Sequence, residues 1–338
     1  MKSRLISILK IAFAVGILVW LARSDYLNFA DLKRALDPVY LPLAALGVLA
    51  MLLSAAERFR FLLKAQGVSI TIRHNFELFF IGQFFNFIIP GGVGGDVVKA
   101  FYLHKDVGAR AKTSPYTVLF DRFIGFYVLA IMGVIVVLLQ WSRFVLMPQL
   151  HALSIAMILL FLALTLIIVL GFWRKSREFI VKIVPHRLGP ARKFMEHIAS
   201  SCEYYSANPH FVLRSLAWGT IMQFFAILAL AAVGVALHLE PIPLSAYFFI
   251  GPLGYIVTSL PIAPAGIGIG QAGFLYFFNA YLGHKSPLGP LSITVLQILS
   301  LFWSLIGLYF YLARRSGPRI THPDSQPHNF CTTKAEPT

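Results

Sequence analysis

Charged residues are scarce in this chain, and their scarcity excludes most water-soluble folds. Of the 338 residues, 13% are Asp, Glu, Lys or Arg, which is about half the share found in soluble domains. Hydrophobic residues make up 58% of the sequence, and the mean hydropathy is +0.74. We therefore predict an integral membrane protein. Because lipid admits only helices and closed barrels, the long apolar runs described below predict an all-α polytopic fold.

Acidic residues are rarer than basic ones. The chain has 29 Lys and Arg residues against 14 Asp and Glu residues, a formal net charge of +15. In a membrane protein such an excess faces the cytoplasm, where anionic lipid headgroups attract it. The basic residues lie between apolar runs rather than on one compact domain. We therefore expect anionic lipid headgroups as partners, and no nucleic acid.

Cysteines and catalytic motifs are also lacking. The two cysteines, Cys202 and Cys331, give neither a disulfide framework nor the spacing of a metal site. The sequence has no His-Glu-x-x-His pattern, no phosphate-binding Gly-Lys-Ser/Thr loop and no Gly-x-Ser-x-Gly turn. We therefore expect no metal and no cofactor. We also expect no catalytic residue, because Asp96 and Asp121 alone are insufficient for a membrane-embedded transferase.

Long apolar runs are what the sequence has in plenty. A bilayer-spanning helix needs about 20 residues, and six runs are close to that length or longer: 5–22, 39–56, 116–140, 154–173, 212–237 and 291–313. We expect the first to be a retained span rather than a cleaved signal peptide, because Lys10 interrupts its apolar core. The membrane domain is predicted to cover 1–313, including a basic amphipathic connector at 174–208. The polar tail, 314–338, is expected to be disordered and cytoplasmic.

Two further apolar segments are broken. Segments 76–89 and 97–103 flank one loop rich in proline and glycine, and segments 244–260 and 267–281 flank another. Backbone polar groups find no water in lipid, so a break at membrane depth must line a cavity or be buried in protein. One broken segment in each half of the chain points to the binding site of a transporter.

The distribution of charge orients the spans, because cation-rich connections of membrane proteins stay in the cytoplasm. The cation-rich segments are 58–73, 105–112, 174–193 and the tail, and the connections expected outside are 23–37, 141–149 and 238–243. These assigned sides agree with the number of spans between them only if each broken segment crosses the membrane either not at all or twice. The two halves then run in opposite directions. We therefore predict an inverted-topology repeat in the cell (inner) membrane, with both termini cytoplasmic.

The first broken loop supplies seven candidate substrate-binding residues: Pro90, Gly91, Gly92, Gly94, Gly95, Asp96 and Lys99. A helix that starts after Gly95 would direct free N–H groups at an anionic group such as a phosphate. Simpler interpretations stay open, in which the glycines only allow close packing and Asp96 only caps the helix. Lys99 either contacts lipid headgroups or merely extends toward the membrane surface.

Ionisable residues also lie inside predicted spans. Asp121 and Arg122 fall in the first turns of the span 116–140, where such residues normally face a cavity or pair internally. Either they neutralise each other, or Arg122 binds a lipid phosphate through its planar guanidinium. Arg58 and Arg60, at the cytoplasmic end of a span, are predicted to anchor the helix to lipid headgroups.

The second broken loop adds further candidates for substrate binding: Pro264, Gly266, Gly268, Gly270 and Gln271. A buried amide such as that of Gln271 needs hydrogen-bond partners. Either the cavity or packing between helices could supply them. The two loops together are predicted to meet near the middle of the membrane.

The ordered motifs of the chain resemble those of a known family. They are Pro-Gly-Gly-Val-Gly-Gly-Asp at 90–96, Asp-Arg-x-x-Gly at 121–125, Pro-Ala-Gly-Ile-Gly at 264–268 and, ahead of them, Arg-Phe-x-x-Leu-Leu at 58–63. This set resembles the lysylphosphatidylglycerol synthase transmembrane region, a family also called flippase-like or UPF0104 membrane proteins. The resemblance covers nearly the whole chain, from about residue 5 to residue 313.

The resemblance implies a non-catalytic membrane protein that translocates a phospholipid or a lipid-linked intermediate, or assists its export, with envelope-biosynthesis enzymes as candidate partners. Two departures matter. Gln271 stands where the family usually carries Glu, which removes an acid for proton coupling. Only about 25 residues follow the last span, too few for the soluble aminoacyl-transfer domain of the synthases. An ion-coupled carrier of a small soluble substrate and a lipid-modifying transferase stay open as alternatives.

Overall fold

The computed structural model describes residues 33–89, 94–107, 114–145, 148–173 and 189–316, with a few isolated positions between 16 and 23. Within these ranges the chain forms helices and connecting loops and no strand, so the predicted all-α polytopic fold is confirmed. Most of the first expected span, residues 174–188 of the basic connector and the tail beyond 316 lie outside the described residues. So do Pro90, Gly91 and Gly92.

Helices long and apolar enough to cross a bilayer coincide with the other five predicted spans. They are α3 (Tyr40–Ala65), α6 (Ser114–Leu139), α8 (Pro148–Phe172), α11 (Pro209–Ala236) and α14 (Leu288–Ser316). Several begin earlier than predicted: α8 and α11 start at a proline and α14 carries one in its first turn. Proline is well tolerated there because the first N–H groups of a helix have no intrahelical partner.

Each predicted broken segment consists of two short helices. The first is α4 (Ile72–Ile88) followed by α5 (Gly94–Val107), and the second is α12 (Leu244–Thr258) followed by α13 (Ile269–Leu282), with the 3₁₀ turn η2 (Pro264–Gly266) between them. With 17, 14, 15 and 14 residues, none of the four helices reaches the length of a full span. Ile89, next to Pro90, is already extended, because a residue before proline is disfavoured in a helix.

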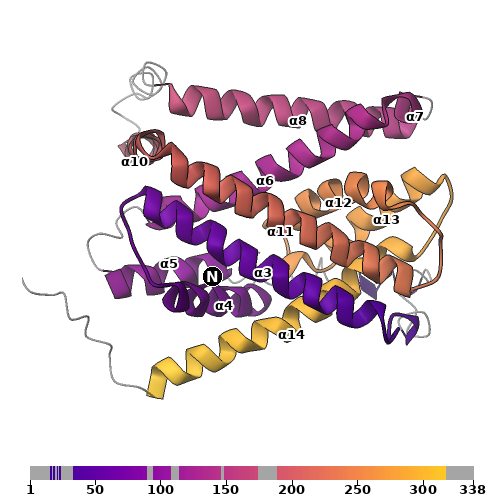
Figure 1. Ribbon diagram of the computed structural model, residues 1–338, viewed down its shortest axis with the longest axis horizontal. Coiled ribbons are helices and arrows are strands. Elements are labelled where there is room, and N and C mark those ends of the chain that lie inside the picture. The colour runs from indigo at the N-terminus through magenta and orange to yellow at the C-terminus, as the bar shows by residue number, and fades with distance from the viewer. Residues whose placement is uncertain are drawn as a thin grey trace, which may run out of the picture.

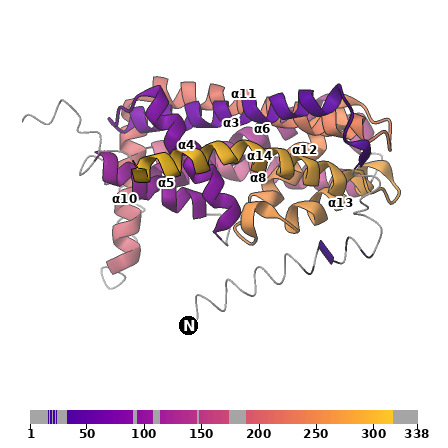
Figure 2. The same cartoon turned by 90° about the horizontal axis from the view of Figure 1, so that it is seen from below.

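The long helices run along one axis of the molecule, and the short helices fill the space among them (Figure 1). In that view α3 and α11 lie side by side. Helices α6 and α8 lie to one side of this pair, and α14 lies to the other. The five-residue α7 (Trp141–Val145) joins α6 to α8. The connector helix α10 (Gly189–Ala207) stands across one end of the bundle, perpendicular to the long helices (Figure 2).

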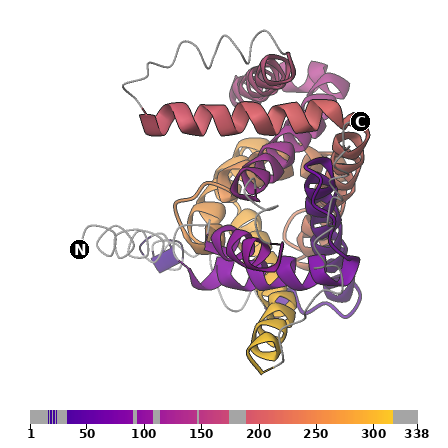
Figure 3. The ribbon, with the colours of Figure 1, turned by 90° about the vertical axis from the view of Figure 1, so that its left-hand side faces the viewer.

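A chain of hydrogen bonds fastens α10 to that end of the bundle. The Thr117 hydroxyl of α6 donates to the Gln66 side chain at 2.7 Å, and the Gln66 amide donates to the Tyr205 hydroxyl of α10, also at 2.7 Å. Gln66 follows the last residue of α3. Figure 3, which looks along the bundle, shows α10 crossing the ends of the long helices.

Glycines set the closest helix contacts. A Cβ atom added to Gly95 of α5 would lie 1.9 Å from the carbonyl oxygen of Gly82 in α4, and one added to Gly307 of α14 would lie 1.9 Å from the carbonyl oxygen of Phe80. These distances are far below van der Waals contact, so the backbones of α4, α5 and α14 touch directly. Gly95 therefore does allow close packing of α4 and α5.

We expect Gly307→Ala to destabilise the protein by about 1–3 kcal/mol, because its methyl group would push α14 away from the α4 backbone. The matched control is Gly171→Ala in α8, where the added Cβ would meet only the Cys202 sulfur at 3.4 Å. Thermal unfolding in detergent compares the two variants. Equal stability of both would show that α14 does not depend on this contact.

Candidate functional site

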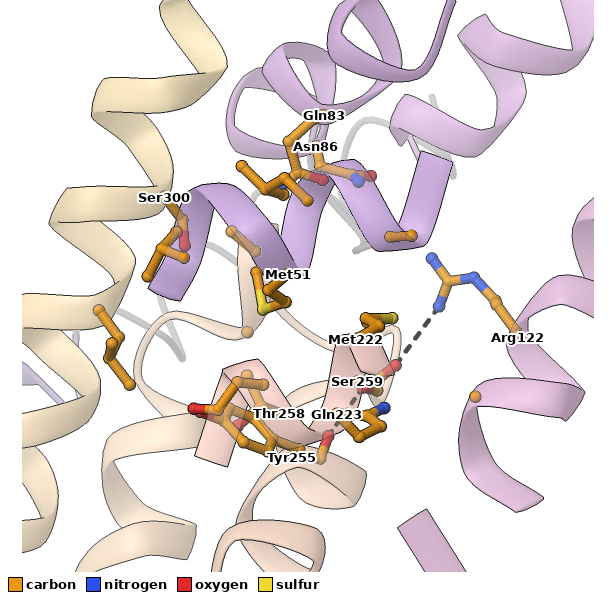
Figure 4. Close-up of a pocket in the computed structure, with 18 of the residues that line it drawn as sticks. Met51, Gln83, Asn86, Arg122, Met222, Gln223, Tyr255, Thr258, Ser259 and Ser300 are labelled. Carbon is orange, nitrogen blue, oxygen red and sulfur yellow. Dashed lines mark hydrogen bonds between the residues drawn. The ribbon is translucent and has the colours of Figure 1, made fainter. Parts of the chain in front are cut away.

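Arg122 contacts residues of both broken segments. From α6, its Nε donates to Asp96 Oδ2 of α5 at 2.5 Å, and its Nη1 donates to the carbonyl oxygen of Ser259 at 3.4 Å. Ser259 is the residue that follows α12. Figure 4 shows the guanidinium reaching from α6 toward Ser259. One side chain of a full span therefore contacts both breaks.

Asp121 does not pair with Arg122, although the two are adjacent in sequence. Its partner is Arg58 of α3, whose Nε and Nη2 donate to the two carboxylate oxygens at 2.8 and 3.0 Å. Both residues are buried. Of the two interpretations left open, the one in which Asp121 and Arg122 neutralise each other is wrong, because adjacent side chains on a helix point in different directions.

Arg58 and Arg60 differ from the predicted headgroup anchors. Arg58 is only 6% exposed and lies inside the bundle against Asp121. Arg60 bonds Glu57 of its own helix, and its side chain is 13% exposed. Each of these arginines has a carboxylate partner within reach. Their side chains therefore bond these carboxylates rather than extend to the membrane surface.

Asp96 and Lys99 form a second charged pair next to Arg122. The Lys99 ammonium lies 3.3 Å from Asp96 Oδ1 and 4.2 Å from the centre of the Phe59 ring. Lys99 is 4% exposed, so it does not extend to the lipid surface. The Asp96 carboxylate occupies the first turn of α5, which is where the helix dipole favours a negative charge. That position is therefore filled by the protein itself.

The first break is tied together by an amide side chain. The Gly95 N–H donates to Asn86 Oδ1 of α4 at 3.0 Å, so this amide is not available to a phosphate. Gly94 packs against Ile89, with an added Cβ 2.2 Å from the Ile89 Cβ.

The second break is held in the same way by amides. Gln271 Oε1 accepts from the Gly268 N–H at 2.7 Å, and its Nε2 donates to Gln297 Oε1 of α14, also at 2.7 Å. Gln297 in turn donates to the carbonyl oxygen of Ala265 at 3.2 Å. Of the two interpretations for Gln271, the structure supports packing between helices.

Glycine is required at two places in this second break. Gly266 and Gly268 have φ values of 69° and 86°, which side chains adopt only with strain. An added Cβ on Gly266 would also lie 2.4 Å from the Thr258 carbonyl oxygen. A Cβ added to Gly270 would lie farther from Thr258, at 3.0 Å from its Oγ1. Pro264 opens the 3₁₀ turn.

A cavity of about 330 Å³ lies between the two breaks. Its described lining includes three cationic side chains, Arg58, Lys99 and Arg122, and two carboxylates, Asp96 and Asp121. The described lining therefore carries a net charge of +1. Of the predicted binding residues, Asp96, Lys99, Asp121, Arg122 and Gly266 line the cavity, whereas Gly94, Gly95, Pro264, Gly268, Gly270 and Gln271 do not.

Sequence reasoning missed the uncharged polar residues of this cavity. Five of them line the cavity: Gln83 and Asn86 of α4, Gln223 of α11, Ser259 at the end of α12, and Ser300 of α14. Figure 4 shows these side chains around one space. All of them except Ser259, which follows Thr258, are isolated polar residues in an apolar run. That isolation is the signal that could have found them, because a lone amide inside a membrane helix needs a partner.

Comparison with known proteins assigns the chain to a family. It matches the family model of the lysylphosphatidylglycerol synthase transmembrane region over residues 7–308. The chain belongs to this family. It is also 27% identical, over 296 residues, to a UPF0104 membrane protein of Methanothermobacter thermautotrophicus, a match that covers 81% of this chain and 85% of that protein.

Two glycines make room for the buried arginine of this member of the lysylphosphatidylglycerol synthase transmembrane-region family. An added Cβ on Gly125 would lie 3.1 Å from Arg58 Nη1, and one on Gly219 of α11 would lie 3.3 Å from Arg58 Cδ. The Met222 sulfur lies 3.2 Å from Nη1. The Asp-Arg-x-x-Gly motif therefore combines a carboxylate for Arg58 with the space that its guanidinium occupies.

Breaking the Arg58–Asp121 pair should strand a buried charge. We expect Arg58→Gln alone to lower stability by about 3–5 kcal/mol, and the double variant Arg58→Gln with Asp121→Asn to recover much of that loss. The control, Arg73→Gln, removes a cation whose side chain is 89% exposed, and should change stability by less than about 0.5 kcal/mol. Thermal unfolding in detergent measures all three. A double variant no more stable than Arg58→Gln would contradict the pairing.

Proposed function

We propose that this protein translocates a phospholipid or a lipid-linked intermediate across the membrane, or assists its export, and that it is not an enzyme. The carrying observation is the cavity between the two broken segments, with its net positive lining and with Arg122 in contact with both breaks. Family membership adds support, because the family takes its name from a lipid-modifying enzyme.

The headgroup would enter the cavity while the acyl chains stay in lipid. A volume of about 330 Å³ is at the lower end for small-molecule sites; it can hold a headgroup but not two acyl chains as well. Apolar side chains such as Met51, Leu52 and Phe126 share the lining with the charged ones. A mixed lining of this kind suits the junction between a polar headgroup and its glycerol ester region.

Arg122 is the residue best placed to bind the phosphate. Its 3.4 Å contact with the Ser259 carbonyl is long for a hydrogen bond, and a phosphate oxygen would make a shorter, charge-assisted bond in its place. Asp96 would keep the guanidinium oriented through Nε. A bound phosphate would thereby loosen the link between α6 and the second break, which couples occupancy to the arrangement of the two broken segments.

Arg122→Gln should leave a folded protein whose lipid transfer is reduced more than about tenfold, because a hydrogen bond to a charged group is worth about 1.5–3 kcal/mol. Asp96 keeps Lys99 as a partner in this variant, so the fold is expected to survive. Transfer of an acyl-labelled phospholipid between leaflets is measured in vesicles by quenching from outside, with Arg73→Gln as the charge-matched control. Wild-type transfer by a folded Arg122→Gln protein would remove Arg122 from the site.

We further propose that the end of the bundle with Lys64, Lys105 and Arg314 faces the cytoplasm, with both termini there, in the cell (inner) membrane. Arg314 Nη1 bonds Asp106 Oδ2 at 3.0 Å, which places the ends of α5 and α14 together. At the opposite end, His284 lies 3.8 Å from Glu240. Concentration of cations at one end supports this orientation.

Single cysteines test the orientation. In a background with Cys202→Ser and Cys331→Ser, the exposed positions Lys105→Cys and Lys285→Cys should react with an impermeant thiol reagent from opposite sides of the membrane. We expect Lys285→Cys to be labelled in intact cells, and Lys105→Cys only after the membrane is opened. Labelling of both from the same side would contradict the topology.

A further inference from the structure

We propose that the substrate headgroup is a monoanionic phosphodiester whose substituent is uncharged and rich in hydroxyl groups, such as a glycerol or a sugar, and not an amine-bearing headgroup. This inference rests on the proposed function and narrows it to one chemical class. The charge of the cavity lining and a group of unpartnered polar side chains carry it.

The charge of the lining matches one negative charge. Three cations and two carboxylates leave an excess of +1 among the described lining residues. A phosphodiester carries a single negative charge at neutral pH, so its arrival neutralises the cavity. A low-dielectric site disfavours any occupant that leaves a net charge behind.

An ammonium group would find no carboxylate available in the described lining. Asp121 is bonded through both oxygens to Arg58. Asp96 is bonded to Arg122 through one oxygen and lies close to Lys99 through the other. An amine would have to displace one of these cations, and truncating or displacing a partner of a buried pair is costly. The cavity therefore disfavours zwitterionic and aminoacylated headgroups.

The unpartnered side chains indicate hydroxyl groups. Gln223 is 5% exposed, lines the cavity and makes no hydrogen bond to any residue that the structure describes. Gln83 and Ser300, from α4 and α14, line the same cavity and likewise lack a partner among the described residues. Figure 4 shows these three side chains at the cavity together with Arg122.

Polar side chains that line a cavity without a protein partner can hydrogen-bond an occupant or water. Carboxamides and hydroxyls both donate and accept, as the hydroxyl groups of a glycerol or a sugar also do. Because the unpartnered groups come from three different helices, a polyhydroxylated substituent can satisfy several of them at once. A phosphate without such a substituent would leave these side chains to water.

Transfer in vesicles tests the headgroup class. The probes are acyl-labelled phosphatidylglycerol, phosphatidylethanolamine and lysylphosphatidylglycerol. We expect phosphatidylglycerol to move at least about fivefold faster than the other two, the difference that a single neutral hydrogen bond can account for. Equal transfer of all three, abolished by Arg122→Gln, would overturn this inference and leave the proposed function standing. Faster transfer of either amine-bearing lipid would also overturn it.

Gln223→Leu separates recognition from packing. The substitution removes an unpartnered buried amide and conserves volume, so we expect unchanged or higher thermal stability together with loss of the preference for phosphatidylglycerol. The matched control, Gln149→Leu, changes an exposed residue at the start of α8 and should keep the preference. Retention of the full preference by Gln223→Leu would exclude Gln223 from headgroup recognition and overturn the inference.

A binding measurement in detergent distinguishes this inference from the proposed function. Thermal stabilisation is compared for short-chain phosphatidylglycerol, a short prenyl phosphosugar and short-chain phosphatidylethanolamine. Selective stabilisation by both hydroxyl-bearing ligands supports the shared chemistry, and stabilisation by one alone identifies the lipid source. Selective binding without transfer in vesicles would overturn the proposed function but not the headgroup class. Equal stabilisation by all three would overturn the headgroup class.

Discussion

The fold depends on satisfying the backbone groups that its two breaks release inside a membrane. Lipid cannot bond a free N–H or C=O, so polar side chains from neighbouring helices must. At the first break, Asn86 takes up the Gly95 N–H. At the second, Gln271 and Gln297 take up the Gly268 N–H and the Ala265 carbonyl. The amides are thus structural requirements of the breaks, and two of them, Asn86 and Gln297, also line the cavity.

The charged residues divide into a fixed pair and a contact that can be exchanged. Arg58 and Asp121 meet through two short hydrogen bonds and are enclosed by glycines of α6 and α11. Arg122 holds Asp96 tightly but reaches the Ser259 carbonyl only at 3.4 Å. A short bidentate pair resists competition from a ligand, whereas a long neutral contact yields to an anion. Two adjacent residues of one helix therefore serve different purposes.

The sequence predicted the elements well and the side-chain partners poorly. Apolar length located the five described spans, and the prolines and glycines located both breaks within a few residues, because lipid imposes strong constraints on length and backbone. The pairing of Asp121 with Arg58 could not be read in the same way. It joins α3 to α6 across 63 positions, and only the packing of three helices brings those charges together. Polar residues of the lining such as Gln223 are visible in the sequence as single polar positions in apolar runs. The sequence does not show that they face one cavity.

The net charge of the cavity has an electrical consequence. A charge that moves through the membrane potential gains or loses about 2.3 kcal/mol per 100 mV. The described lining by itself carries an excess of +1, and a bound monoanion would cancel that charge. If a transport cycle moves this lining through the membrane, the voltage would act on the step without a bound monoanion and not on the step with one. Any voltage dependence of such a cycle would therefore enter through its return step.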